Sequence, residues 1–247
     1  MATHFARGII SEGHLVSTRL PVSCHDTARQ LPEHRRTRFL ASRALLAEMM
    51  FMLYGTSELP EIVIESSGKP KFADVRLPHF SLAYAGNMVG VAITTEGECG
   101  LDMELQRATR SFHSVHAQKP LFSNNELLWI NNQNDPNEAQ TQLVTLRQSA
   151  MKLIHQMHDD QGLLQLLPGS GRLRLTPLTR VEVMSDAEDV LIWSVAVSPA
   201  IESLKIWEFD SRTGWRYLSD VQTRANDPAS RLMRFTSLPA EKALILN

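Results

Sequence analysis

The sequence has little cysteine and no long apolar run. Its two cysteines, Cys24 and Cys99, are too few for the disulfide framework of a secreted domain and are not spaced like zinc ligands. No stretch approaches the roughly 18 to 20 apolar residues that cross a bilayer, and the start lacks the apolar segment of a signal peptide. We therefore expect two reduced thiols and a cytoplasmic location.

The sequence also lacks an excess of charge and the common catalytic motifs. The net charge is -2, which gives no general reason to expect a nucleic-acid or membrane partner. No Gly-x-Ser-x-Gly, P-loop or dinucleotide-binding pattern occurs, and none of the nine histidines pairs at a zinc spacing. The usual hydrolase and nucleotide-binding motifs are thereby excluded.

Helical periodicity is strong in two long segments. With 43% hydrophobic residues, the chain can bury one large core or two small ones. Apolar residues at steps of three and four predict helices over 33–54 and 138–157. A shorter helix is predicted over 123–131, where Ser123 and Glu126 match a capping box.

Strand-like segments follow each long helix. Residues 88–95 and 99–105 predict two strands joined by a short polar link, which is typical of a hairpin. The order helix, then strands, therefore occurs twice. The polar segment 107–120 has no regular period and is the best candidate for a linker, so we expect subdomains over 1–106 and 107–247.

Two carboxylates two residues apart are the first candidate for chemistry. Asp102 and Glu104 lie on one face of a predicted strand, about 7 Å apart along the backbone. Mg²⁺ commonly binds one or two carboxylates, together with water and phosphate oxygens. The same alternation with Leu101 and Met103 is equally typical of a solvated strand face, so the spacing alone leaves both explanations open.

Basic and amide side chains supply further candidates. Gly68-Lys69-Pro70 combines a turn with a cation that binds phosphate, although an exposed turn with lysine is common. Arg36 and Arg43 are seven residues apart and share a helix face, as an anion site requires. Gln148 and Lys152 are one helical turn apart. Each pattern alone is also explained by an ordinary surface.

Taken in order, six segments resemble the motif series of the 4'-phosphopantetheinyl transferases. The chain looks like the surfactin-type branch, and its full length is similar to the enterobacterial YieE-like proteins within that branch. The resemblance covers about residues 30–155 by motif, and its segments are Arg38 to Leu46, Gly68 to Pro70, Phe80 to Ala85, Gly100 to Glu104, Phe122 to Glu126 and Arg147 to Lys152.

The resemblance implies an α+β fold built as a pseudo-twofold pair of similar subdomains. Each subdomain would be a long helix packed on a small antiparallel sheet, with the coenzyme A cleft between the two. Such proteins move 4'-phosphopantetheine from coenzyme A to a serine of an apo acyl or peptidyl carrier protein, in a reaction that depends on Mg²⁺. Two halves in one chain make a monomer sufficient.

The resemblance also assigns roles to single residues. Asp102 and Glu104 match the metal-binding carboxylates, and Lys152 would lie near the pyrophosphate. Positions lining the nucleotide and phosphate part of the coenzyme A cleft are matched by Arg43, Lys69 and Pro70.

Two positions depart from the family pattern. Tyr84 stands where the family has a phosphate-contacting histidine, and tyrosine has no positive charge to offer. Gln148 replaces a glutamate that is a third metal ligand or general base, and an amide has no usable basicity. A slow enzyme is expected unless Glu126 or a metal-bound water accepts the proton. The alternative is a weakened member that binds coenzyme A or a carrier protein without efficient transfer.

Overall fold

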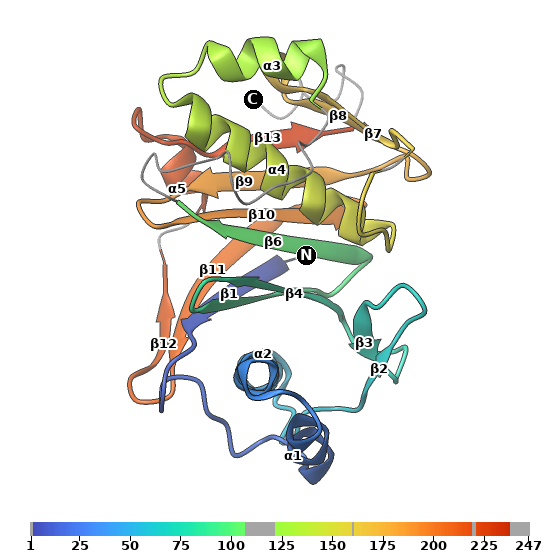
Figure 1. Ribbon diagram of the computed structural model, residues 1–247, viewed down its shortest axis with the longest axis vertical. Coiled ribbons are helices and arrows are strands. Elements are labelled where there is room, and N and C mark those ends of the chain that lie inside the picture. The colour runs from blue at the N-terminus through green and yellow to red at the C-terminus, as the bar shows by residue number, and fades with distance from the viewer. Residues whose placement is uncertain (1, 107–121, 160, 219–220, 238–247) are drawn as a thin grey trace.

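The computed structural model describes residues 2–106, 122–159, 161–218 and 221–237, which form two larger sheets and a small two-stranded one (Figure 1). The first sheet has the order β12 (Gly214–Tyr217), β11 (Ser203–Asp210), β1 (Ala2–Ile9), β5 (Met88–Thr94) and β4 (His79–Ala85). The second has the order β6 (Glu98–Leu105), β10 (Leu191–Ser198), β9 (Glu182–Ala187), β13 (Met233–Thr236), β8 (Arg172–Leu175) and β7 (Leu164–Leu167). The small sheet pairs β2 (Ile62–Ile64) with β3 (Pro70–Phe72).

The first long helix confirms the prediction from periodicity. Helix α2 spans Glu33–Tyr54 and ends at Gly55, whose left-handed backbone (φ 69°) suits a residue without a Cβ. It follows the short α1 (Val22–Arg29) and lies below the first sheet in Figure 1. Its Leu45 and Met49 are fully buried in a core that includes Val91 of β5.

The second long helix is shorter than predicted. Helix α4 spans Pro136–Leu153, with Asp135 as its cap, and stops four residues before the predicted end. His155 just beyond it has a positive φ of 56°. Helix α3 (Asn124–Asn131) begins with the predicted capping box of Ser123 and Glu126. Two short helices complete the described chain, namely η1 (Pro168–Ser170) and α5 (Val221–Ala225).

The predicted hairpin of 88–95 and 99–105 is wrong. Strand β5 belongs to the first sheet, whereas β6 pairs with β10 in the second. The turn between them packs tightly on the far end of β10, since a Cβ on Gly97 would lie 1.8 Å from the Ser198 carbonyl oxygen. The chain therefore leaves one sheet and enters the other at this glycine.

Each sheet draws strands from both sides of residue 106. Strand β6 precedes that residue but lies in the second sheet, while β11 and β12 follow it but lie in the first. Strand β1 pairs parallel with β11, so the ends of the chain are interwoven. The structure thus confirms a mixed α+β class. The predicted linker 107–120 lies outside the described residues, and the division into 1–106 and 107–247 stays a prediction.

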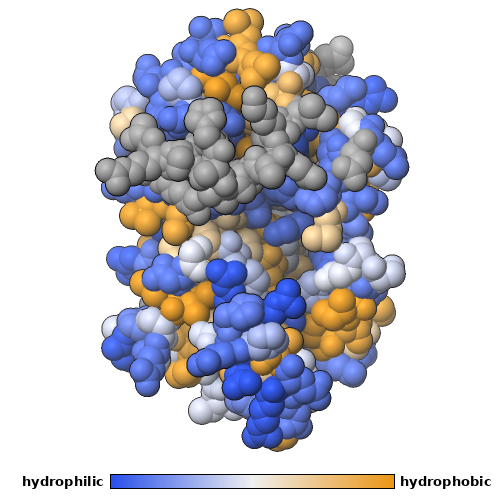
Figure 2. All heavy atoms as spheres, in the orientation of Figure 1, coloured by the Kyte–Doolittle hydropathy of each residue, from blue (hydrophilic) through white to orange (hydrophobic). Residues whose placement is uncertain are grey.

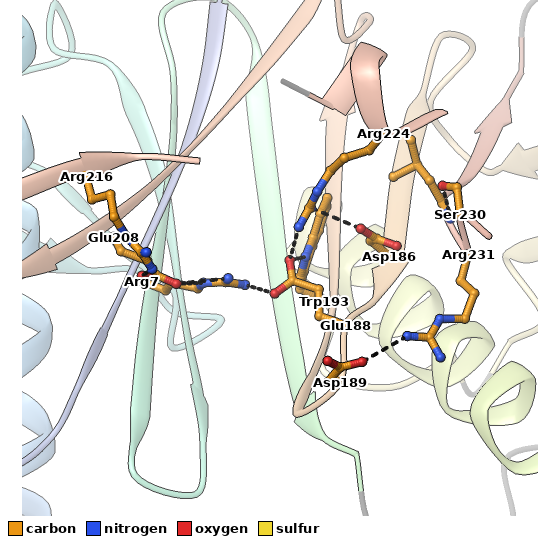
Figure 3. Close-up of polar contacts among 11 residues, drawn as sticks. Arg7, Asp186, Glu188, Asp189, Trp193, Glu208, Arg216, Arg224, Ser230 and Arg231 are labelled. Atoms are coloured by element: carbon orange, nitrogen blue, oxygen red, sulfur yellow. Dashed lines mark hydrogen bonds and ion pairs between the residues drawn. The ribbon is translucent and has the colours of Figure 1, made fainter. Parts of the chain in front are cut away.

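The two larger sheets share one core and meet at two polar junctions. Phe5, Leu101 and Trp193 are fully buried between the sheets. At one junction β4 and β6 lie side by side (Figure 1). At the other, Arg7 of β1 reaches Glu188, just after β9 (Figure 3). Among the described residues, no helix is both long and apolar enough to cross a membrane.

The surface carries scattered apolar side chains. Leu127 and Leu128 of α3 are 43% and 64% exposed. Figure 2 shows hydrophobic atoms at the end of the molecule where α3 lies, within an otherwise mixed surface.

Candidate functional site

Strand β6 presents opposite chemistries on its two faces. Leu101 and Met103 lie in the core between the sheets. Asp102 and Glu104 point to the other face, and Asp102 is directly opposite Ser194 of β10. The Ser194 hydroxyl is 2.8 Å from the Thr145 hydroxyl of α4, so this face lies beneath the helix.

A close helix–strand contact fixes that arrangement. A Cβ on Gly100 would lie 2.0 Å from the carbonyl oxygen of Ser149, so only glycine lets α4 approach β6 this closely. The contact brings the last turns of α4 over Asp102, whose side chain is only 20% exposed. The solvated strand face is therefore the wrong explanation for Asp102.

Lys152 of α4 enters the junction between the sheets. Its ammonium donates to the Leu82 carbonyl of β4 at 3.1 Å and to the Leu101 carbonyl of β6. Its Nζ lies 3.6 Å from Asp102 Oδ1. Burial lowers the pKa of Lys152, and the Asp102 carboxylate opposes that shift. The lysine thus links both sheets and the predicted metal ligand.

Asp102 is short of positive charge. Burial, with Glu104 adding to it, raises the pKa of the Asp102 carboxyl to about 6, although Lys152 opposes the shift. Asp102 thus lies between one carboxylate, Glu104, that disfavours its charged form and one ammonium, Lys152, that favours it. The described residues contain no group of three or more His, Cys, Asp or Glu that would hold a metal ion alone.

Lys69 lies at the end of α4. Its ammonium donates to Glu98 Oε2 at 3.0 Å, to the Cys99 carbonyl at 3.3 Å and to the Lys152 carbonyl at 3.4 Å. These acceptors equal the number of its N–H bonds. Pro70 begins β3 and pairs with Ile64.

Arg43 is the contrasting cation. Its guanidinium stacks 4.3 Å from the centre of the Phe39 ring, donates to the Ser42 hydroxyl at 3.1 Å, and interacts electrostatically with Tyr84 of β4. Burial lowers the pKa of Arg43, which is 8% exposed. Within the described part of the chain it makes no ion pair with a carboxylate.

Gln148 and its neighbour Arg147 differ in their surroundings. Gln148 is half-buried, and no hydrogen bond joins its amide to another described residue. Arg147 pairs with Glu126 and lies 3.6 Å from Asp159. Glu126, which also accepts from the Ser123 backbone at 2.8 Å, is therefore committed to Arg147 and to the cap of α3.

The structure groups the predicted residues into two sets. Asp102 and Lys152 meet beneath α4, Glu104 lies on the same face of β6, and Lys69 lies at the helix end. Arg43 and Tyr84 form a second pair at the first sheet. Strand β4 connects the sets, because Leu82, which binds Lys152, is two residues from Tyr84.

Sequence reasoning missed several residues of this region. Ser81 accepts the Leu101 backbone N–H at 3.0 Å, and Glu98 binds both Lys69 and His79. These contacts join distant parts of the chain, so local spacing gives no signal for them. An open cavity of about 530 Å³ lies beside the turn between β2 and β3, and it is lined by Ser66, Ser67 and residues 154–158.

Comparison with known proteins gives one full-length similarity and several partial ones. No family model matches the chain. The chain is 62% identical to the uncharacterized protein YieE of Escherichia coli strain K12, over 100% of both chains. It is 38% identical over 93 residues to the 4'-phosphopantetheinyl transferase AcpT of the same strain, covering 38% of this chain and 44% of AcpT. The AcpT of Salmonella typhi is 33% identical over 81 residues, or 39% of its length.

Proposed function

The chain belongs to the YieE family, and from this premise we propose that it is a 4'-phosphopantetheinyl transferase. It would transfer 4'-phosphopantetheine from coenzyme A to a serine of an apo carrier protein, with Mg²⁺, and release adenosine 3',5'-bisphosphate. The partial identity to AcpT supports the superfamily. The proposal includes the pseudo-twofold fold, a cytoplasmic location and action as a monomer.

One observation carries the proposal beyond similarity. Asp102 and Glu104 lie on one strand face, and among the described residues Lys152 is the one ammonium that pairs with Asp102. An unbalanced carboxylate pair at the junction of two sheets suits a divalent cation, which would restore neutrality. Arg43, a buried guanidinium that pairs with no carboxylate of the described residues, likewise suits an anion such as a phosphate of coenzyme A.

The donor set fits Mg²⁺ rather than a metal held wholly by protein. Two carboxylates are what Mg²⁺ commonly takes from a protein, with water and phosphate oxygens as its other ligands. Bound there, the ion would neutralise charge on the coenzyme A pyrophosphate. Asp102 and Glu104 would hold it, and Lys152 would keep Asp102 in place and add positive charge nearby.

The remaining residues divide into those that bind and those that orient. Arg43 and Tyr84 would bind the nucleotide and phosphate part of coenzyme A, while Lys69 and Pro70 would shape the turn beside it. When the serine hydroxyl attacks phosphorus, its proton needs an acceptor. Gln148 has no basicity, and Glu126 is bound to Arg147. A water molecule is therefore the better candidate for the proton acceptor.

A second candidate function rests on that missing base. Tyr84 and Gln148 both replace groups that the family uses, and a positioned general base contributes about 10²- to 10⁴-fold to rate. A member that binds coenzyme A or a carrier protein without efficient transfer is the alternative.

Intact-mass spectrometry tests the proposal. Several apo carrier proteins are incubated with the protein, coenzyme A and Mg²⁺, and a gain of one phosphopantetheine is expected on at least one of them. An Asp102→Ala variant and a sample with chelator should both abolish the gain. Binding of coenzyme A or of a carrier protein without any gain would favour the second candidate, and the absence of both kinds of binding and of any gain would overturn both.

A further inference from the structure

We propose that Glu98 is a positioning residue of the site: it holds Lys69 and His79 and thereby fixes the end of α4 from which Lys152 extends. Its effect on coenzyme A rests on the proposed function, whereas its effect on α4 does not.

Lys69 acts as a cation at the end of α4. The last carbonyls of a helix have no partner within the helix and carry partial negative charge. The Lys69 ammonium donates to the carbonyl of Lys152, the residue before the end of α4, at 3.4 Å. Its side chain is only 12% exposed, so the contact is largely shielded from water.

Glu98 in turn holds Lys69 in that position. Its Oε2 accepts from Lys69 at 3.0 Å, and its Oε1 lies 2.9 Å from His79 Nδ1 at the start of β4. Burial opposes ionisation, but the contacts with His79 and Lys69 lower the pKa of Glu98 to about 2. The carboxylate therefore ties the β2–β3 turn, the first sheet and the first residue of β6 together.

The consequence reaches the site through α4. Lys152 offers its carbonyl to Lys69 and its ammonium to Leu82, Leu101 and Asp102. Loosening the last turn of α4 would move this ammonium relative to Asp102. Glu98 forms no hydrogen bond or ion pair with Lys152 or Asp102 among the described contacts, so it acts through Lys69.

A competing role for Lys69 predicts the opposite sign. If Lys69 binds a phosphate of coenzyme A and Glu98 merely restrains it, Glu98→Gln frees the ammonium and tightens binding. If Glu98 positions Lys69 at the helix end, the same substitution weakens binding.

Calorimetric titration of the protein with coenzyme A, in the presence of Mg²⁺, separates the two roles. Glu98→Gln and Lys69→Met should each weaken binding about two- to fivefold, the effect of losing a cation at a helix end. The double variant should be no weaker than the single ones, because both remove one interaction. His79→Gln, which leaves the Lys69 contact, should have a smaller effect, and Glu48→Gln on α2 is the matched control for a half-buried carboxylate. Tighter or unchanged binding in Glu98→Gln, or additive losses, would overturn the proposal.

Hydrogen exchange provides a readout that needs no coenzyme A. Amides of residues 149–154 should exchange faster in Glu98→Gln and Lys69→Met, but not in Glu48→Gln. If the unaltered protein binds no coenzyme A, the proposed function fails while this measurement still decides the positioning role. Unchanged exchange at the end of α4 would overturn it.

Discussion

The two polar junctions between the sheets differ in charge balance. The inter-sheet network consists of three arginines and three carboxylates that alternate from β12 to α5 (Figure 3): Arg216, Glu208, Arg7, Glu188, Arg224 and Asp186. In the described part of the chain, the site beneath α4 has two carboxylates on one strand face, Asp102 and Glu104, and one ammonium, Lys152, which pairs with Asp102. Both lie where the same two sheets meet, so burial alone does not explain the difference.

The network balances its charges internally, as a structural role requires, whereas the imbalance at Asp102 is the basis of the proposed cation site. In the network, Glu188 accepts from Trp193 and Arg224 and pairs with Arg7 at 2.6 Å, so each of its oxygens has a partner. Burial opposes ionisation of Glu188, yet Arg7 and these partners lower its pKa. At the site, burial and Glu104 raise the pKa of Asp102 instead. The surroundings of Glu188 thus favour its charged form, and those of Asp102 disfavour it.

Removing the central arginine should cause the largest change. Arg7→Met leaves Glu188 and Glu208 without their shared cation, and breaking a buried pair costs about 3–5 kcal/mol. Because both glutamates are partly exposed, we expect about 2–4 kcal/mol less free energy of unfolding, measured by urea denaturation at pH 7. Coenzyme A affinity of the folded fraction should be unchanged. A loss below about 1 kcal/mol would contradict a structural role for the network.

Supplying the missing base tests the other junction. Gln148→Glu introduces a carboxylate one turn before Lys152 on α4 and should raise the rate of phosphopantetheine transfer by about 10²-fold, the low end of general-base effects. Progress curves from intact-mass spectrometry measure it. Gln140→Glu makes the same change two turns earlier on α4, about 12 Å away along the helix axis, and should not raise the rate. No gain from Gln148→Glu in an inactive protein would count against a merely weakened transferase.

Neutralising Asp102 should stabilise the fold while removing function. A carboxyl whose pKa is raised in the folded state, here from 3.8 to about 6, destabilises the fold at pH values above 6. Allowing for its partial exposure, Asp102→Asn should therefore add about 1–2 kcal/mol to the free energy of unfolding at pH 8. The gain should shrink as pH falls through 6 toward 4, because the native carboxyl then becomes neutral too. Denaturation at pH 8 and pH 5 measures this, and a variant less stable at pH 8 would contradict it.

Much of the fold was predictable because it depends on local pattern. The bounds of α2 follow from its periodicity and Gly55, and the capping box of α3 from Ser123 and Glu126. Strand partners were not predictable in this way. The predicted hairpin of β5 and β6 is wrong because β6 pairs with β10, a strand far along the chain that local pattern does not identify as its partner. Strand β1 is unpredicted for a similar reason, since its partners are β5 and β11.

The candidate site was predictable as a set of residues but not as a set of roles. Alternation in β6 correctly places Asp102 and Glu104 on one face. It gives no means of seeing that α4 covers this face, or that Lys69 is bound by Glu98, 29 positions away. Charge balance depends on such distant pairs, so only the fold distinguishes Lys69, which Glu98 binds, from Arg43, which pairs with no described carboxylate.

The exposed end of the network should contribute least. Arg216 pairs with Glu208 but is 70% exposed, so water replaces most of what the arginine provides. Arg216→Ala should therefore lower the free energy of unfolding by at most about 0.5 kcal/mol, and salt should reduce even that. The same denaturation assay used for Arg7→Met gives the ratio of the two losses. A ratio near one would mean that the network acts as a unit, and that its buried centre has no special share in holding the sheets together.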